Sequence, residues 1–282
     1  MNDLLELYAI STMQDGVNWA EIMGRQMCPY LQKVCSKTRK SAPDITIGSC
    51  SVTYGKENRR IIICPHRLLE RGQIFLDCIH LLTLHEPGNE LHVVSEVTIP
   101  GGSVDYFLVS VRDDRVIDFV GIELQTLDTT GTVWPARQRF LQEQGVTGTA
   151  READPAKSFG MNWKMTAKTI LMQLNHKIQT FENVNKHLAL VLQDYLLTYM
   201  QQVFQFEHVG DARLGDSMQF HVYTLAQAEK GSFRLKLAER LSTDAAGVAA
   251  CLGLQADPNV TLARIVKVLE EKISPETLFS PV

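Results

Sequence analysis

Three closely spaced extended segments constrain the fold of this chain most strongly. Residues 91–99, 104–111 and 116–126 are rich in apolar and β-branched residues, and such runs favour β-strands. A Pro-Gly-Gly sequence at 100–102 separates the first two segments, and two aspartates at 113–114 separate the second from the third. Because these residues favour tight turns, the sequence predicts a meander of three antiparallel strands.

Helical and further extended patterns flank the meander. Residues 1–24 hold short helical signals, and 25–64 are rich in lysine, serine, cysteine and glycine without sustained periodicity, which favours a small loop-rich module. A helical pattern with a proline in its first turn covers residues 65–84. The remaining expected elements are helices at 161–181, 194–204, 235–241 and 262–272 and strands at 188–192 and 217–224.

This order of elements predicts the fold class α/β (α+β), with a mixed sheet flanked by helices. We expect two parts, an N-terminal segment and module over residues 1–64 and a larger part over residues 65–282.

Composition sets expectations for the cellular location. The longest apolar runs, such as residues 188–192, are far shorter than the roughly 18 residues that a membrane-spanning helix needs. The N-terminus carries Asp3 and Glu6 where an export signal would be basic. Six cysteines without such a signal favour thiols or metal ligands over disulfides. We therefore expect a soluble protein of a reducing cytoplasm, without a membrane partner.

The charge of the chain is unevenly distributed. The net charge is −4, yet residues 25–71 hold ten Lys or Arg and three acidic residues, which leaves +7 there and −11 elsewhere. Such asymmetry is typical of a segment that faces a polyanion, although a solvated basic surface explains it equally well.

Asp105, Glu123 and Gln125 form the most informative set of polar residues. Glu123 and Gln125 lie two apart in the third predicted strand, so their side chains share one face. If the strands pair across the aspartate turn, Asp105 lies opposite a residue near 122, to the tolerance of one bulge. Two carboxylates on neighbouring positions of adjacent strands are suited to hold Mg²⁺ beside a phosphate.

The spacing of these residues resembles the PD-(D/E)XK nuclease signature in its Glu-x-Gln variant. The surrounding sequence is similar to that of the NotI-type restriction endonucleases. The similar stretches are IPGGSVDY (99–106), IELQTLDTTG (122–131), WP (134–135), NWK (162–164) and LALVLQ (188–193), so the resemblance covers about residues 90–200.

The resemblance implies a PD-(D/E)XK nuclease core and a Mg²⁺-dependent, homodimeric type II restriction enzyme of prokaryotic origin that cuts double-stranded DNA at a specific sequence. It makes Asp105 and Glu123 metal ligands and places Gln125 where the usual lysine stands. An amide can orient a water molecule but supplies no positive charge. Transition-state charge then falls to the metal and to Lys164 or Lys168 on the next predicted helix.

Many members of this nuclease class have a further acidic residue near the first strand or the preceding helix. Glu96 is the preferred candidate because it lies near the end of the first strand, close to the Gly-Gly turn. Glu70 and Asp77 on the earlier predicted helix compete for the role.

Basic residues supply candidate DNA contacts. Arginine suits both phosphates and the guanine edge, and these candidates are Arg59, Arg60, Arg137, Arg139, Lys164 and Lys168. A packed loop around Trp134 explains Arg137 and Arg139 equally well.

Four of the six cysteines, Cys28, Cys35, Cys50 and Cys64, fall within 37 residues. Their spacing contains no Cys-x-x-Cys pair and so departs from ordinary zinc knuckles. NotI-type enzymes are similar in carrying a four-cysteine metal site near the N-terminus, so the resemblance implies a structural metal ion here. Four thiolates admit iron or zinc, and the resemblance favours iron. Four unligated thiols, or His66 in place of one cysteine, remain alternatives.

Two other functions compete with the nuclease. One is a metal-stabilised DNA-binding or regulatory protein whose nuclease core is not catalytic, and the presence of Asp105, Glu123 and Gln125 disfavours it. The other is a small-molecule hydrolase, which is disfavoured because the sequence contains no nucleophile elbow, P-loop or dinucleotide fingerprint.

Overall fold

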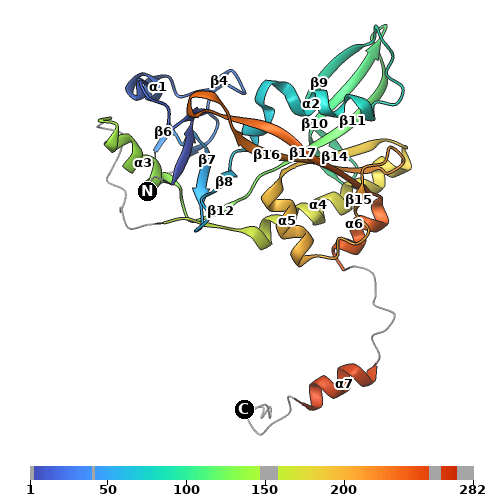
Figure 1. The fold of residues 1–282 in the computed structure, drawn as a ribbon. Coiled ribbons are helices and arrows are strands. Elements are labelled where there is room, and N and C mark those ends of the chain that lie inside the picture. The colour runs from blue at the N-terminus through green and yellow to red at the C-terminus, as the bar shows by residue number, and fades with distance from the viewer. Residues whose placement is uncertain (1–2, 40–41, 147–157, 254–261, 272–282) are drawn as a thin grey trace.

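A mixed sheet of seven strands forms the centre of the structure, a computed structural model that describes residues 3–39, 42–146, 158–253 and 262–271 (Figure 1). Strands β11, β14 and β16 are parallel, and the other neighbours are antiparallel. In sheet order the strands are β15 (Gly210–Asp211), β17 (Phe233–Thr243), β16 (Met218–Gln227), β14 (His187–Gln193), β11 (Arg115–Gln125), β10 (Gly102–Arg112) and β9 (Glu90–Ile99).

The predicted meander is confirmed as β9, β10 and β11. The pairing of β10 with β11 shifts once, between Ser110 and Val111, and Tyr106 then lies opposite Ile122. Asp105 and Glu123 are therefore the next residues on two adjacent strands, as the predicted register requires within one bulge.

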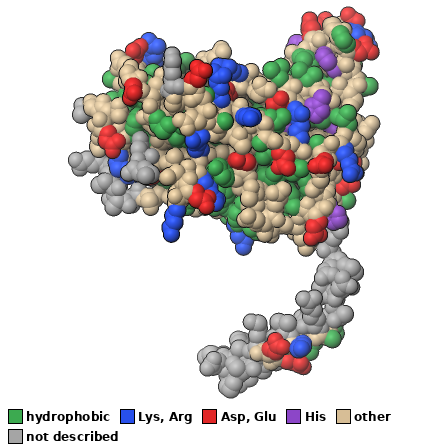
Figure 2. Space-filling model, viewed as in Figure 1, with side chains coloured by type: hydrophobic (Ala, Val, Ile, Leu, Met, Phe, Trp, Pro, Cys, Tyr) green, Lys and Arg blue, Asp and Glu red, His purple; other side chains and the backbone are tan. Residues whose placement is uncertain are grey.

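The far end of the meander projects beyond the rest of the sheet (Figure 1). Acidic side chains gather at its tip (Figure 2), where the β10–β11 turn carries Asp113 and Asp114. Arg112 and Arg115 flank these two aspartates on the paired strands, so charges of both signs lie at the tip.

Two apolar cores lie on the two faces of the sheet. Along β14, Leu188, Leu190 and Leu192 belong to one core, and Ala189 and Val191 to the other, as the alternation of side chains along a strand requires. The first core is covered by α4 (Trp163–Asn183), α5 (Asp194–Val203) and α6 (Ala245–Cys251). The second packs against η1 (Pro65–Gly72), α2 (Gln73–Cys78) and η2 (Ile79–Leu81).

The helix expected over residues 65–84 is interrupted, so that prediction was partly wrong. Arg71 (φ 54°) and Gly72 (φ 65°) adopt left-handed backbone conformations between η1 and α2. A helix cannot continue through such residues, and the apolar spacing alone did not reveal the break.

The helix expected at 235–241 is wrong, because these residues lie in β17. Phe233 and Leu235 are buried while Arg234 and Lys236 are exposed, which is the two-residue period of a strand. Antiparallel pairing with β16 over the full length of β17 decides the outcome.

The N-terminal part contains a second sheet that the sequence did not predict, in the order β2-β1-β7-β8. Its buried Leu4, Leu7, Val52 and Ile61 belong to the same core as α4, so this part shares the main core. The elements are β1 (Leu4–Leu7), β2 (Ile10–Ser11), α1 (Trp19–Arg25), β3 (Met27–Cys28), β4 (Lys33–Val34), β5 (Thr38–Arg39), β6 (Ala42–Thr46), β7 (Ser49–Tyr54) and β8 (Arg59–Ile62).

Several smaller elements complete the described chain. Helix α3 (Trp134–Glu143) lies between two of the expected elements, where the sequence predicted neither a helix nor a strand. The others are β12 (Thr129–Thr130), β13 (Gly160–Met161), η3 (Glu229–Gly231) and α7 (Leu262–Glu270). Among the described residues, no helix combines the length and the apolarity needed to cross a membrane.

Candidate functional site

Asp105 and Glu123 lie on the adjacent strands β10 and β11. The Oδ2 atom of Asp105 accepts a hydrogen bond of 2.8 Å from the backbone N–H of Leu124. This bond ties the carboxylate to the strand that carries Glu123. Gln125 donates from Nε2 to the carbonyl oxygen of Thr126 at 2.6 Å, which leaves its amide oxygen available as a ligand or acceptor.

A buried lysine that the sequence interpretation missed completes this group. Lys177 on α4 donates from Nζ to Glu123 Oε1 at 2.6 Å, and the two side chains are only 7% and 5% exposed. The sequence assigned the compensating positive charge to Lys164 or Lys168 on this helix. Lys177 is instead the lysine that reaches the acids.

The Gly-Gly turn between β9 and β10 makes room for this lysine. A Cβ atom at Gly101 would overlap the carbonyl oxygen of His176, and one at Gly102 would lie 3.1 Å from the Lys177 side chain. The hydroxyl of Thr180 donates to the carbonyl oxygen of Pro100 at 2.8 Å. The turn therefore packs directly on α4, which only glycine permits at this distance.

The environment of Glu123 perturbs its acidity. Burial raises the pKa of Glu123 from 4.5 to about 7, against the lowering effect of Lys177, and the charge of Asp105 raises it further. Two carboxylates that repel each other in a buried place favour a cation between them. A titration near neutral pH also marks the group as a candidate for function.

The three candidates for a further acid have different surroundings. Glu96 has a left-handed backbone (φ 56°) in β9, between residues that pair with β10 on either side of Asp105. Glu70 accepts from Arg67 at 3.0 Å and from Leu235 N at 2.6 Å. Asp77 accepts from Tyr223 Oη at 2.6 Å. Of the three, Glu96 is the one beside Asp105.

His66, at the start of η1, faces the same acids. Its pKa is lowered by burial and by Lys33 and Lys37, while Asp105 and Glu96 raise it. Its buried Nδ1 atom has no hydrogen-bond partner among the described residues. His66 is therefore close enough to Asp105 and Glu96 to be affected by their charges.

The grouping of possible metal ligands limits which ions the described residues can hold. Among the residues that the structure describes, no three or more His, Cys, Asp or Glu side chains are grouped so that they could hold a metal ion. The pair of Asp105 and Glu123 with the Gln125 amide still fits Mg²⁺, which binds through one or two carboxylates and keeps several waters.

The four predicted cysteines are buried free thiols. The pKa of Cys64 is raised by burial and, to a smaller extent, by Cys35 and Cys28. The pKa of Cys50 is raised by burial and then by Cys64. The thiols are therefore close enough to affect one another, although sequence separations of up to 36 residues divide them.

The predicted DNA contacts divide into exposed and buried residues. Lys164 and Lys168 are exposed on α4. Arg59 pairs with Glu57 at 2.9 Å, and Arg60 donates to Gln227 at 3.0 Å. Arg59 and Arg60 are of intermediate exposure, so none of the four side chains is buried.

Arg137 does not fit the predicted DNA contact. It is fully buried and donates to the carbonyl oxygens of Ile47 (2.8 Å) and Thr46 (3.3 Å). Its guanidinium also lies 4.5 Å from the ring centre of Trp134. Arg137 thus holds the N-terminal part against α3, as the packed-loop alternative supposed. Arg139 is 32% exposed and pairs with Asp3 at 3.4 Å.

Lys177 could have been found from the sequence by one signal. The buried face of α4 carries Ile170, Leu174, Ile178 and Phe181, and Lys177 is the charged residue within that face. A lysine inside an apolar stripe needs a buried partner. His66 gave no comparable signal.

Comparison with known proteins points in one direction. A family model described as restriction endonuclease NotI matches residues 20–236, which is more than half of the chain. No curated protein and no solved structure gives a significant match.

Proposed function

The chain belongs to the NotI restriction endonuclease family, and from that premise we propose that Asp105 and Glu123 form its catalytic centre. Family membership makes the protein a type II site-specific deoxyribonuclease that acts on double-stranded DNA. The observation that carries the proposal is the buried pair of Glu123 and Lys177 beside the partly exposed Asp105, in which burial raises the pKa of Glu123 to about 7. The mixed sheet, with the acids on an antiparallel meander, supports a PD-(D/E)XK core.

We propose hydrolysis of the phosphodiester bond by a water molecule in line with the leaving oxygen. Asp105 and Glu123 would hold Mg²⁺, which supplies an acidified water and offsets negative charge on the phosphate. Gln125, whose amide oxygen has no hydrogen-bond partner among the described residues, orients the attacking water by a hydrogen bond. Glu96 contributes a further carboxylate from β9.

Lys177 supplies the positive charge that Gln125 lacks. Its ammonium carries three donors, and one of them engages Glu123. The remaining donors are suited to a phosphate oxygen that gains charge in the transition state. In the absence of substrate, Lys177 partly compensates the buried carboxylate of Glu123.

For the N-terminal part we propose a structural iron or zinc ion held by Cys28, Cys35, Cys50 and Cys64. The four thiols are buried, Cys35 and Cys28 raise the pKa of Cys64, and Cys64 raises that of Cys50. They form a soft donor set of the right class. Lys37, whose charge lowers the pKa of Cys64, assists ionisation of a thiol. Elemental analysis of untagged protein tests the proposal, since less than about half an equivalent of iron plus zinc per chain would contradict it.

The remaining proposals concern assembly and DNA contacts. A homodimer matches a palindromic recognition site, and six free cysteines suit a prokaryotic cytoplasm. Arg59, Arg60, Lys164 and Lys168 are the proposed phosphate contacts. Membership of this family does not favour a non-catalytic regulatory protein.

A direct assay tests the proposed function. Purified protein is incubated with long unmethylated DNA and Mg²⁺, and we expect discrete fragments. Asp105→Asn and Glu123→Gln should each lower the rate at least about a thousandfold, which corresponds to several kcal/mol of transition-state stabilisation. Both variants should still bind DNA when Ca²⁺ replaces Mg²⁺. Wild-type cutting by either variant would disprove the site.

A further inference from the structure

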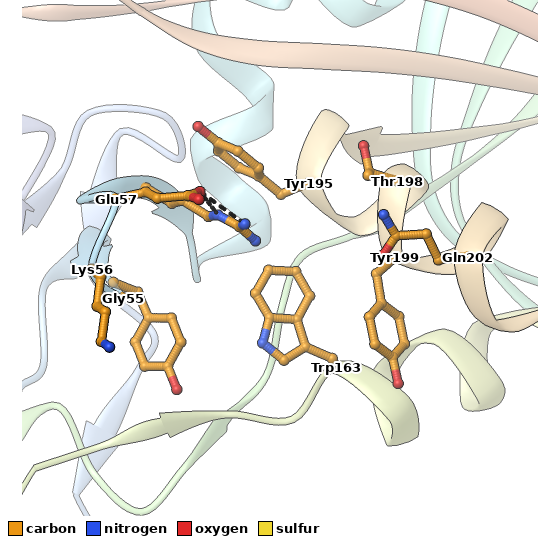
Figure 3. Close-up of a pocket in the computed structure, with 10 residues that line it drawn as sticks. Gly55, Lys56, Glu57, Trp163, Tyr195, Thr198, Tyr199 and Gln202 are labelled. Atoms are coloured by element: carbon orange, nitrogen blue, oxygen red, sulfur yellow. Dashed lines mark hydrogen bonds and ion pairs between the residues drawn. The ribbon is translucent and has the colours of Figure 1, made fainter.

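A cavity lined by aromatic rings lies apart from the acid pair (Figure 3). Its volume is about 510 Å³, and its aromatic lining consists of Tyr54, Trp163, Tyr195 and Tyr199. Figure 3 shows the indole of Trp163 in the middle, with Tyr195 above it and Tyr199 to its right. A cavity of this volume can hold one nucleotide.

The rings are only half-buried, which is unusual for four large aromatic side chains in one place. Each of the four is of intermediate exposure. Trp163 and Tyr199 lie 5.7 Å apart between ring centres, so they support each other on one side of the cavity. Aromatic faces that remain open to solvent are suited to stack on a planar ligand.

Cations lie beside these rings. Lys56 is exposed and lines the cavity, and Arg59 lies 5.6 Å from the ring centre of Tyr195. Glu57 also lines the cavity and pairs with Arg59 at 2.9 Å, so the anion of a ligand would lie beside Lys56 and replace Glu57 as the partner of Arg59. A planar group next to an anion then matches the lining. A nucleotide, with a base and a phosphate, has this chemistry.

The walls of the cavity are held in place by hydrogen bonds. Gln193, at the end of β14, accepts from Ile62 N at 2.8 Å and donates to the carbonyl oxygen of Arg60 at 2.5 Å. These bonds fix β8 against the strand end from which Tyr195 follows. The site is therefore formed before a ligand arrives, which lowers the entropic cost of binding.

Helix α4 runs from the cavity to the acid site, with Trp163 at the cavity and Lys177 beside Glu123. Fourteen residues of α4 separate Trp163 from Lys177, which is about 21 Å at a rise of 1.5 Å per residue. DNA spans this length in about six base steps of 3.4 Å. Lys164 and Lys168 are exposed on the same helix and can follow the backbone between the two places.

We propose that this cavity binds one DNA nucleotide whose base has left the helical stack, with the base on Trp163 and the phosphate near Lys56 and Arg59. Inside a duplex the faces of the bases are covered by their neighbours, so only an unstacked base can use these rings. The proposal rests on DNA as the substrate but not on the roles of Asp105 and Glu123.

Tryptophan fluorescence tests the proposal without cleavage. Trp19 and Trp134 are 4% and 1% exposed, whereas Trp163 is half-buried and lines the cavity. A stacked base should therefore quench Trp163 selectively. With EDTA present, titration with a (dT)12 oligonucleotide should quench the wild-type protein, and an abasic chain of twelve deoxyribose phosphates should not.

Variants measure the contribution of stacking. Trp163→Ala should weaken binding of fluorescein-labelled (dT)12 roughly 5- to 100-fold, as expected for one base–aromatic stack. Trp163→Phe should retain affinity within about threefold while losing the quenching signal. Met165→Ala is the matched control, because Met165 is on the same helix, 54% exposed and outside the cavity.

Each contrary result is informative. Equal quenching by the abasic chain, or unchanged affinity of folded Trp163→Ala, would overturn the proposal. Binding of free dTMP as tight as that of (dT)12 would also overturn it, because the cavity would then be a mononucleotide site. Glu123→Gln should quench as the wild type does, so a failure of the proposed catalytic centre leaves this result intact.

Discussion

Two buried ion pairs of this molecule have opposite surroundings. Where η1 packs against the N-terminal part, Arg67 donates to Glu6 at 2.9 Å, to Glu70 at 3.0 Å and to the carbonyl oxygen of Phe233 at 3.0 Å. Ser51 donates to Glu6 at 2.7 Å. At the acid site, Lys177 donates to Glu123 and to no other described residue. Each of the three nitrogens of Arg67 donates to a partner, whereas the single nitrogen of Lys177 uses one of its three donors on a described residue.

The pKa values express the same difference. Burial lowers the pKa of Arg67, but Glu6 and its neighbours outweigh this and raise it, so the guanidinium stays charged. At the acid site burial outweighs Lys177, and the pKa of Glu123 rises to about 7. A pair with every partner in place stabilises the fold, whereas a pair that remains under-compensated is suited to receive a metal ion and a phosphate.

Replacement of Arg67, the cation of the first pair, should have the largest effect on the free energy of unfolding. Arg67→Met leaves Glu6 buried without its partner, and breaking a buried pair costs about 3–5 kcal/mol. Urea unfolding at pH 7 measures the loss. The control is Arg112→Met, whose pair with Glu86 is 48% and 65% exposed and should cost less than about 1 kcal/mol. Equal losses in both variants would contradict the comparison.

Replacement of Lys177, the cation of the under-compensated pair, should affect catalysis more than folding. Lys177→Met should lower the cleavage rate about 10²- to 10³-fold, as for loss of one transition-state donor. Its loss of stability should be smaller than that of Arg67→Met, because Glu123 can take up a proton. Lys186→Met is the matched control, since Lys186 also pairs at 2.6 Å, with the buried Asp118. A cleavage rate in Lys177→Met equal to that of the control would assign Lys177 to structure alone.

The sequence predicted the central part of the fold because short-range patterns determine it. The meander, α4, β14, α5 and β16 follow from alternation, helical spacing and turn residues. The register of β10 with β11 was within one residue because both strands meet at a tight turn. Strand β17 was misassigned because leucine spacing is ambiguous without its partner β16.

The sequence predicted the part of the acid site that depends on short-range patterns and missed the part that depends on long-range packing. Asp105, Glu123 and Gln125 lie on neighbouring strands, so local register places them. Lys177 comes from 54 residues further along the chain, and Glu6 and Arg67 are 61 residues apart. Contacts over such separations depend on how α4 and η1 pack on the sheet, which periodicity does not report.

The Gly-Gly turn offers a smaller test of the acid site. Gly101 and Gly88 have nearly equal backbone angles (φ 100° and 97°), but only Gly101 has neighbours where a Cβ would lie. Gly88→Ala should therefore cost only backbone strain of about 1–2 kcal/mol. Gly101→Ala should cost about 1–3 kcal/mol more from overpacking and should slow cleavage by displacing α4 at Lys177. Melting temperatures and cleavage rates of the two variants measure this, and identical behaviour would show that the turn does not position the lysine.

The titration of Glu123 also predicts that the stability of the fold depends on pH. The folded-state pKa of Glu123 is raised from 4.5 to about 7, so between these values the folded chain binds more protons than the unfolded chain. Stability then falls as pH rises through this window, with a slope of at most one proton. Glu123→Gln should remove that part of the slope, and urea unfolding in EDTA at several pH values from about 4.5 to 8 measures it.

The ionisation of Glu123 should lower stability as the pH rises but should raise the rate of cleavage. Only the ionised carboxylate can hold Mg²⁺, so the cleavage rate should fall about tenfold per pH unit below 7 at low Mg²⁺. Because the ion competes with the proton, more Mg²⁺ should move this limb to lower pH. Lys186→Met, which leaves Glu123 and its partner in place, should keep the wild-type profile. A wild-type limb that stays at one pH at all Mg²⁺ concentrations would mean that the titrating group is not a metal ligand, and the contrast between the two buried pairs would lose its functional meaning.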